Sequence, residues 1–352
     1  MPREYVEIRV RTVLNRVEGM PFRWSINPYR GCAHACVFCY ARRTHGFLEE
    51  DGIQGWGNRI FVKVNAPEVL RAELAHPAWK REEVAIGTAT DPYQPIEGRY
   101  RLTRRILEAL RDARTPASLV TRSPLILRDV DVLLALHQRA GLAVWVSIAT
   151  LDPDMARNLE PTVAPPHQRL RTVARLRAAG LEVGVLLAPI LPGLTDAPKA
   201  LEAVIRAAWD HGARFIGHSV LNLGEVTREA FFRFLQDRHP ELVALYERLY
   251  PRKYAPRAYI KAVDRIVERY RERLGFRGRP LPRGPQQLLL LSRTVWVPPP
   301  RGATPLGGRG NPQAPTRGLP EPPGSGCARS GEGAPAAPGG ASPPWPGRSP
   351  GA

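Results

Sequence analysis

Between residues 20 and 225, short apolar segments rich in β-branched residues alternate with longer amphipathic segments. Short apolar runs are typical of buried strands, and amphipathic runs are typical of helices that cover a sheet. The alternation therefore predicts βα units and a mainly parallel sheet. The expected strands are residues 23–27, 83–87, 118–121, 143–148, 182–187 and 214–218, with residues 59–64 as a possible extra strand beside the first.

Three of the amphipathic segments end in glycine directly before the next expected strand, at Gly141, Gly180 and Gly212. Glycine accepts the left-handed conformation that often ends a helix, so each glycine marks a helix-to-strand boundary. Asp152 and Pro153 give the opposite signal, a capping residue followed by proline at the first helical position. Six parallel strands with helices between them predict an α/β fold with an open or partial barrel.

The segments that flank this core have a different character. Residues 227–275 are amphipathic and predict a helical extension. From Val297 onward the chain is largely proline and glycine, and it cannot bury enough apolar surface to offset its ordering entropy. A functional basic tail and out-of-frame translation of GC-rich DNA both remain open for this segment. We expect an N-terminal segment 1–19, a core 20–225, a helical C-terminal extension 226–296 and a disordered Pro/Gly-rich tail 297–352.

The chain is strongly basic, with 51 basic and 33 acidic residues, a formal net charge of +18 and a pI of about 10.5. This excess favours a polyanionic partner such as nucleic acid. Only five of the basic residues are lysines, so the compositional bias of a GC-rich genome is the alternative explanation. No apolar run approaches the ~20 residues of a membrane helix, and the charged N-terminus lacks the apolar part of a signal peptide. We therefore expect a cytoplasmic protein without a membrane partner.

Three of the four cysteines lie in the segment NPYRGCAHACVFCY, residues 27–40, with the spacing C-x-x-x-C-x-x-C at Cys32, Cys36 and Cys39. The fourth, Cys327, lies in the tail and is given no role. Clustered cysteines indicate a metal site in a reducing compartment rather than a disulfide framework. Thiolates are the ligands of iron–sulfur clusters, and one tight loop can wrap a cluster of four irons. Three thiolates leave one iron without a protein ligand, where a small molecule can bind.

Two other metal sites fit the same cysteines. Zinc could bind the three thiolates with His34 or His45 as the fourth ligand. A cluster used only for electron transfer is also possible, although such clusters normally have four cysteines. The zinc site would make the chain a zinc-stabilised nucleic-acid-binding protein without catalysis, which is the alternative to an enzyme.

At this motif the chain resembles the radical S-adenosylmethionine (SAM) superfamily, in which an aromatic residue, here Phe38, precedes the third cysteine. More narrowly it is similar to the spore photoproduct lyase-like branch. The similar segments are NPYRGCAHACVFCYAR at 27–42, KVN at 63–65, GTATDPYQPIE at 87–97, and residues 120–129, 146–152 and 188–196. The resemblance covers residues 20–225 and implies a partial (β/α)6 TIM-type barrel.

The resemblance also implies the site. Cys32, Cys36 and Cys39 would bind a [4Fe–4S] cluster, and SAM would bind the open iron through its amino and carboxylate groups. The residues expected around SAM are Phe38 near the adenine, Thr90 and Asp91 at the amino group, Arg122 at the carboxylate, Ser147 at the ribose or carboxylate, and Ala188 and Pro189 near the adenine. Tyr40, Tyr93 and Tyr100 are candidates for the substrate side of the pocket.

The implied reaction begins when a one-electron reductant of the flavodoxin or ferredoxin class reduces the cluster. SAM is then cleaved reductively to a 5′-deoxyadenosyl radical, which abstracts hydrogen from the substrate. The sequence leaves the substrate open between nucleic acid, a small metabolite and a protein side chain.

One position departs from the branch. Spore photoproduct lyase needs a thiol in the segment that corresponds to residues 87–91, where it returns a hydrogen atom to the product radical. Here Thr88 stands at that place, and no cysteine occurs between Cys39 and Cys327. Because a hydroxyl O–H bond is too strong to donate hydrogen to a carbon radical, we expect a lyase-like enzyme that is not a spore photoproduct lyase.

Overall fold

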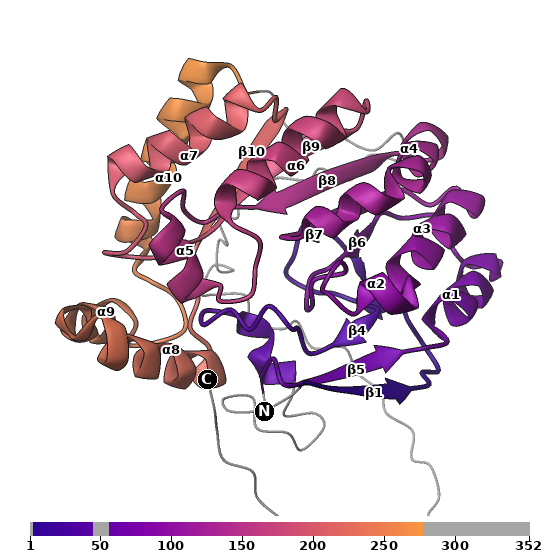
Figure 1. Ribbon diagram of the computed structural model, residues 1–352, viewed down its shortest axis with the longest axis horizontal. Coiled ribbons are helices and arrows are strands. Elements are labelled where there is room, and N and C mark those ends of the chain that lie inside the picture. The colour runs from indigo at the N-terminus through magenta and orange to yellow at the C-terminus, as the bar shows by residue number, and fades with distance from the viewer. Residues whose placement is uncertain (1–2, 45–55, 277–352) are drawn as a thin grey trace, which may run out of the picture. The chain divides into compact units, whose positions relative to one another are not determined.

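A seven-stranded sheet forms the centre of the computed structural model, which describes residues 3–44 and 56–276 (Figure 1). Its strand order is β10-β9-β8-β7-β6-β3-β2. The strands are β2 (Asn15–Arg16), β3 (Trp24–Ile26), β6 (Val84–Ile86), β7 (Ala117–Thr121), β8 (Leu142–Ser147), β9 (Glu182–Ile190) and β10 (Phe215–Val220). All neighbours from β3 to β10 are parallel, and β2 is antiparallel to β3. The six expected strands and the partial-barrel fold are confirmed.

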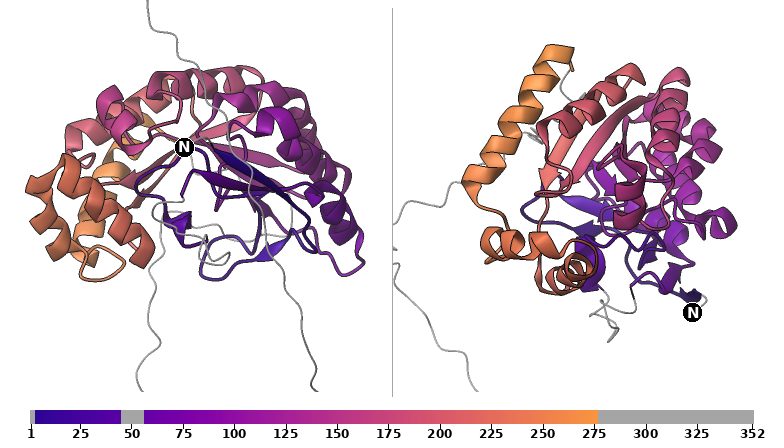
Figure 2. Two further views of the ribbon diagram at one scale, coloured as in Figure 1. Left: turned by 60° about the horizontal axis from the view of Figure 1, so that its bottom comes forward. Right: turned by 60° about the vertical axis from the view of Figure 1, so that its left-hand side comes forward.

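Helices connect the parallel strands, as parallel pairing requires. They are α1 (Ala66–Ala75), α2 (Glu97–Tyr100), α3 (Leu102–Asp112), η3 (Pro124–Asp129), α4 (Val130–Arg139), α5 (Pro153–Leu159), α6 (Pro166–Ala178) and α7 (Pro198–Asp210). Figures 1 and 2 show the longer helices as an outer layer around the strands. Gly141, Gly180 and Gly212 have φ values of 98°, 93° and 78°, so all three end their helices as expected. Asp152 caps α5 by accepting hydrogen bonds from two backbone amides, those of residues 154 and 155.

A second sheet corrects the expectation for residues 59–64. The segment is a strand, β5 (Arg59–Lys63), but it does not lie beside β3. It is the central strand of a three-stranded sheet between β1 (Glu4–Ile8), which is parallel to it, and β4 (Tyr29–Arg30), which is antiparallel. The apolar pattern predicted the strand itself. Its partners are β1 and β4, which the sequence did not predict.

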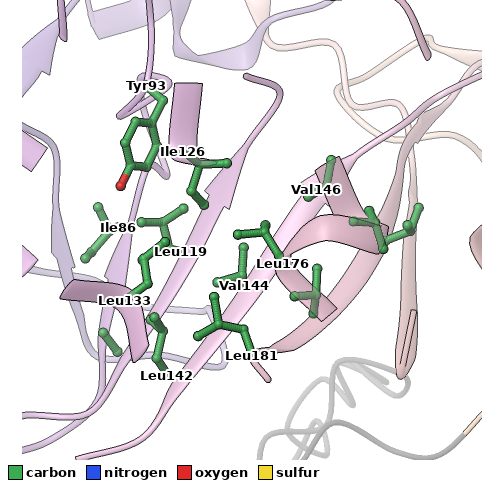
Figure 3. Close-up of a cluster of buried hydrophobic side chains, with 14 of the residues drawn as sticks. Ile86, Tyr93, Leu119, Ile126, Leu133, Leu142, Val144, Val146, Leu176 and Leu181 are labelled. Atoms are coloured by element: carbon green, nitrogen blue, oxygen red, sulfur yellow. The ribbon is translucent and has the colours of Figure 1, made fainter. Parts of the chain in front are cut away.

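The main core lies between the sheet and its helices (Figure 3). Ile86, Leu119 and Val144 come from three adjacent strands, and Leu133 and Leu176 from α4 and α6. All five are fully buried. Burial of each such side chain stabilises the fold by about 1.5–3 kcal/mol relative to exposure. The core therefore fixes the parallel strands against the helices, with the carboxyl ends of the strands at one edge of the sheet.

The expected helical extension is formed by α8 (Glu225–Arg238), η4 (Pro240–Leu242), α9 (Val243–Leu249) and α10 (Arg257–Leu274). Helix α10 packs against α7 and β10, and α8 packs against η1 (Tyr40–Thr44), directly after the cysteine motif. Within the described residues no helix is both long and apolar enough to cross a membrane. Residues 277–296, the tail 297–352 with Cys327, and His45 lie outside the described residues.

Candidate active site at the mouth of the barrel

The cysteine loop follows the first barrel strand and lies between β4 and η1. Cys32 and Cys36 are 7% and 6% exposed, and Cys39 is partly buried. The loop backbone is tied to distant segments by single hydrogen bonds. They run from the Ala33 amide to Gln94 Oε1 (2.9 Å), from Thr162 Oγ1 to the Ala33 carbonyl (2.6 Å), from the Val37 amide to the Leu159 carbonyl (3.0 Å), and from Thr227 Oγ1 to the Cys39 carbonyl (3.1 Å). These contacts preorganise the three thiols.

Thr90 and Gln94 hold the start of this loop. Thr90 Oγ1 donates to the Gly31 carbonyl at 2.7 Å and accepts from Gln94 Nε2 at 3.0 Å. Both side chains are buried. The turn after β6 is therefore fastened to the residue that precedes Cys32, and the Thr90 hydroxyl proton is already committed to the protein.

The Asp91 carboxylate links the turn after β6 to the end of β7 and to the cysteine loop. One carboxylate oxygen accepts from the Tyr93 amide (2.9 Å) and Thr121 Oγ1 (2.7 Å), and the other accepts from the Arg122 amide (2.7 Å) and lies 3.3 Å from His34 Nδ1. Burial opposes ionisation, but His34 and these hydrogen bonds outweigh it and lower the Asp91 pKa. A carboxylate has about four acceptor positions, and three of those of Asp91 are filled by hydrogen bonds from the protein. Its contact with the amino group of SAM stays a prediction.

Arg122 follows β7 and is held in place by a buried ion-pair network. Its Nε donates to Glu160 Oε1 at 2.8 Å, and its Nη2 to the Ala188 carbonyl at 3.3 Å. The other oxygen of Glu160 accepts from Arg169 Nη2 at 2.5 Å. The Arg122 guanidinium lies 5.8 Å from the centre of the Phe38 ring, so Arg122 is next to the cysteine loop. The contacts of Arg122 with the SAM carboxylate and of Phe38 with the adenine stay predictions.

Ser147 is the last residue of β8, also as expected. Its carbonyl accepts from Arg169 Nη1 at 2.9 Å. Its hydroxyl is buried and has no hydrogen-bond partner in the part of the chain that the structure describes. Because buried polar groups are normally satisfied, this hydroxyl is free to contact a bound molecule.

The thiols influence one another's ionisation. Burial raises the pKa of Cys36 and raises that of Cys39 to about 11, and both respond to the charge of the other cysteines. Burial also disfavours the Cys32 thiolate, but the neighbouring His34 outweighs it and lowers the Cys32 pKa. His34 itself is held as a cation, because Asp91 and Cys32 overcome burial and raise its pKa to about 10. Its Nδ1 faces Asp91, so this nitrogen is committed to a carboxylate.

These residues fit an iron–sulfur cluster. Over residues 3–44 and 56–276, no three His, Cys, Asp or Glu side chains converge closely enough to hold a single metal ion. Each thiolate of a [4Fe–4S] cluster binds a different iron, so its ligands need not meet at one point. Three thiols on one anchored loop, two of them buried and one partly buried, suit a cluster with one open iron. The Ser147 hydroxyl, which has no partner among the described residues, also lies at the carboxyl edge of the sheet.

The three candidate tyrosines lie in different environments. Tyr40 is 45% exposed, and its hydroxyl donates to the Thr88 carbonyl. Tyr93 is fully buried in the main core, so it does not line an open pocket (Figure 3). Tyr100 donates to Glu7 at 2.6 Å on the small sheet. Tyr40 alone of these three remains next to the cysteine loop.

Sequence reasoning missed Gln94, Glu160 and Arg169. Gln94 lies inside the segment GTATDPYQPIE, so its place in a recognised motif was the available signal. Glu160 and Arg169 belong to no motif and lie on either side of the loop between α5 and α6. Only their burial, 3% and 1% exposed, reveals their role.

Comparison with known proteins identifies the family. The family described as the Radical SAM superfamily matches residues 26–205, about half of the chain. A protein of Mycobacterium tuberculosis (strain ATCC 25618 / H37Rv) is 40% identical over 257 residues, which cover 72% of this chain and 76% of the relative. The chain belongs to the radical SAM superfamily. It is an enzyme whose cofactors are a [4Fe–4S] cluster and SAM, it cleaves SAM by a radical mechanism, and it requires an electron donor.

Two further proteins are similar to this chain, one over a shorter aligned region and one at a lower sequence identity. Radical SAM Nalpha-GlyT isomerase of Pseudomonas phage M6 is 28% identical over 47% of this chain and 33% of its own length. Spore photoproduct lyase complexed with dinucleoside spore photoproduct shares the fold, with a TM-score of 0.57, 17% identity, and coverage of 77% of this chain and 79% of the lyase.

Proposed function

We propose that this radical SAM enzyme abstracts hydrogen from a nucleic acid substrate. The observation that carries the proposal is the basic excess of the sequence. The tail 297–352 contains five arginines and two glutamates, so it accounts for only three of the eighteen net positive charges. Residues 3–44 and 56–276, which the structure describes, contain 42 basic and 28 acidic residues, and their net charge of +14 would attract a polyanion to the folded enzyme. The dinucleoside in the lyase complex is consistent with this substrate class.

The protein's own residues would position the reactants. Cys32, Cys36 and Cys39 would hold the cluster, and Arg122, fixed by Glu160, would present guanidinium donors to the SAM carboxylate. The unpaired Ser147 hydroxyl would contact the ribose or carboxylate. When bound, the cluster and SAM supply the electron and the 5′-deoxyadenosyl radical. The buried loop would exclude water from that radical.

The electron donor would be a small protein of the flavodoxin or ferredoxin class. After hydrogen abstraction the enzyme would not use the thiol chemistry of spore photoproduct lyase. Cys32, Cys36 and Cys39 are the only cysteines among the described residues, and all three belong to the cluster loop. Thr88, which stands where the lyase has its thiol, receives a hydrogen bond from Asn27 Nδ2 at 3.2 Å.

The test is SAM cleavage by the anaerobically reconstituted protein with dithionite, measured as 5′-deoxyadenosine formed with and without DNA. We expect DNA to stimulate cleavage, and the stimulation to fall steeply as salt increases. Deuterium should pass from labelled DNA to deoxyadenosine. Heparin serves as the polyanion control. Equal rates with and without DNA, and no deuterium transfer, would favour a small metabolite or a protein side chain as substrate.

A further inference from the structure

Lys63 is a buried cation that has no counterion among residues 3–44 and 56–276. It ends β5 and is 9% exposed. Its Nζ donates one hydrogen bond, at 2.8 Å, to the Asn27 carbonyl, and it makes no ion pair with any described carboxylate. An ammonium has three donors, so two remain available. Burial and the nearby Arg30 lower the Lys63 pKa to about 8, which shows that this environment disfavours the charge.

Arg30 lies on the same face of the small sheet. In the antiparallel pairing of β4 with β5, Arg30 is opposite Phe61, which places Arg30 diagonal to Lys63 on one face. Arg30 also forms no salt bridge with the described residues. Arg122 and Arg169 differ from Arg30, because both pair with the buried carboxylate of Glu160. Two neighbouring cations without a described carboxylate between them repel one another, and an anion bound between them would relieve this repulsion.

The two cations lie beside the reaction centre. The carbonyl that Lys63 contacts belongs to Asn27, directly after β3, at the carboxyl edge of the barrel. The side chain of Asn27 bonds to Thr88 Oγ1 at 3.2 Å and to the Ala89 amide at 2.8 Å, so it supports the turn after β6. Arg30 precedes Cys32 by two residues. The site is therefore linked directly to both loops that form the barrel mouth.

We propose that Lys63 and Arg30 form a subsite for a phosphate group of the substrate. The assignment rests on the proposed function, in which the substrate is nucleic acid. A phosphate offers several acceptor oxygens and full negative charge, which suit the two remaining ammonium donors and the guanidinium fork. The carboxylate of SAM is the competing anion, and the experiment separates the two.

The experiment measures binding of a fluorescein-labelled single-stranded 12-nucleotide DNA to the reconstituted enzyme by anisotropy. Lys63→Met removes the charge and keeps the length of the side chain, and Arg30→Gln removes the second charge. Lys80→Met is the matched control, because Lys80 is exposed and precedes β6 at the opposite edge of the sheet. Iron content and thermal unfolding establish that each variant is loaded and folded.

We expect Lys63→Met to weaken DNA binding about 10- to 100-fold, as expected for a lost charge-assisted hydrogen bond in a buried site. The slope of log affinity against log salt should fall by about one, and inorganic phosphate should compete with DNA less effectively than in the wild type. Arg30→Gln should act in the same direction. SAM affinity should be unchanged in both variants, and Lys80→Met should bind DNA nearly as well as the wild type.

Two results would overturn the subsite and leave the proposed function intact: equal DNA binding by wild type and Lys63→Met, or a loss of SAM affinity in place of DNA affinity. Wild-type enzyme that does not bind DNA but binds phosphate through Lys63 would overturn the nucleic acid substrate and retain an anionic one. Binding of neither probe would overturn both.

Discussion

Replacing Glu160 by glutamine should both destabilise the chain and weaken SAM binding. Glu160 is 3% exposed and bridges Arg122 and Arg169, with N–O distances of 2.8 and 2.5 Å. Arg169 is 1% exposed, so the variant leaves a buried cation without its carboxylate. Breaking a buried ion pair costs about 3–5 kcal/mol. Glutamine keeps one acceptor oxygen, and we therefore expect the free energy of unfolding to fall by about 3 kcal/mol.

The effect on SAM follows from Arg122. With its Nε partner neutralised, the guanidinium is no longer fixed opposite the Phe38 ring, and we expect SAM affinity to fall about tenfold, equivalent to ~1.4 kcal/mol. Urea unfolding measures the stability, and titration of SAM into the loaded protein measures the affinity. Glu97→Gln is the matched control, because Glu97 is fully buried and pairs with Arg128 at 2.8 Å away from the cysteines. It should be destabilised less than Glu160→Gln, because Arg128 keeps a second carboxylate, that of Asp129, at 2.7 Å, and its SAM affinity should be unchanged.

The pH dependence gives a second check on Glu160. Burial raises its pKa, but Arg169 and Arg122 outweigh burial and hold the pKa below the usual value. The stabilisation by the Glu160 ion pairs is therefore complete above the pKa of about 4.3 that a glutamate has in the unfolded chain. It is lost as the pH falls through the lower pKa of Glu160 in the folded protein. Wild type and Glu160→Gln should converge in stability only in acid. A difference in unfolding free energy below about 1 kcal/mol at pH 7, or equal loss of SAM affinity in Glu97→Gln, would show that Glu160 does not hold Arg122 in place for SAM.

Three further outcomes follow from single contacts. Gly184→Ala should unfold much of the protein or lower its melting temperature strongly, because the added Cβ would clash with the ring and the backbone carbonyl of Phe215. Thermal unfolding measures this effect, and a near-native melting temperature would contradict it. Gln94→Leu should reduce iron retention in a chelator challenge, because the Ala33 amide loses its partner, whereas equal iron loss from wild type would contradict the anchoring role. Wild type should bind DNA more tightly than Lys63→Met, and this difference in affinity should shrink as the pH rises above about 8, where Lys63 loses its proton. Arg30 is the charged group that faces Lys63. A constant difference in affinity up to about pH 10 would exclude Lys63 as the cation.

The sequence predicted the barrel strands because each is an apolar run next to a strong punctuation signal. Gly141 ends a helix with φ of 98°, and the pattern of its neighbours shows where β8 begins. The small sheet could not be predicted in the same way. Its strand β4 has only two residues, Tyr29 and Arg30, and their pairing with β5 depends on tertiary contacts.

The site shows the same division. The three cysteines could be found because their spacing carries the chemistry. The order of β7 and β8 then placed Arg122 and Ser147 at one edge of the sheet. Glu160 carries no such signal, because an acidic residue between two helices is ordinarily solvated. Its function arises only when folding buries it between two arginines. Asp91 shows the converse, since its place in a motif did not reveal its three hydrogen bonds from the protein or its ion pair with His34.

We expect the cysteine loop to hold a [4Fe–4S] cluster with one iron open to SAM. The most direct measurement is anaerobic reconstitution of the full chain, followed by dithionite and SAM, with iron, sulfide and 5′-deoxyadenosine quantified together. We expect about four irons and four sulfides per chain and formation of deoxyadenosine, with both the cluster and the deoxyadenosine lost in Cys36→Ala. Bound zinc in place of iron, or a fully loaded cluster that yields no deoxyadenosine, would contradict it.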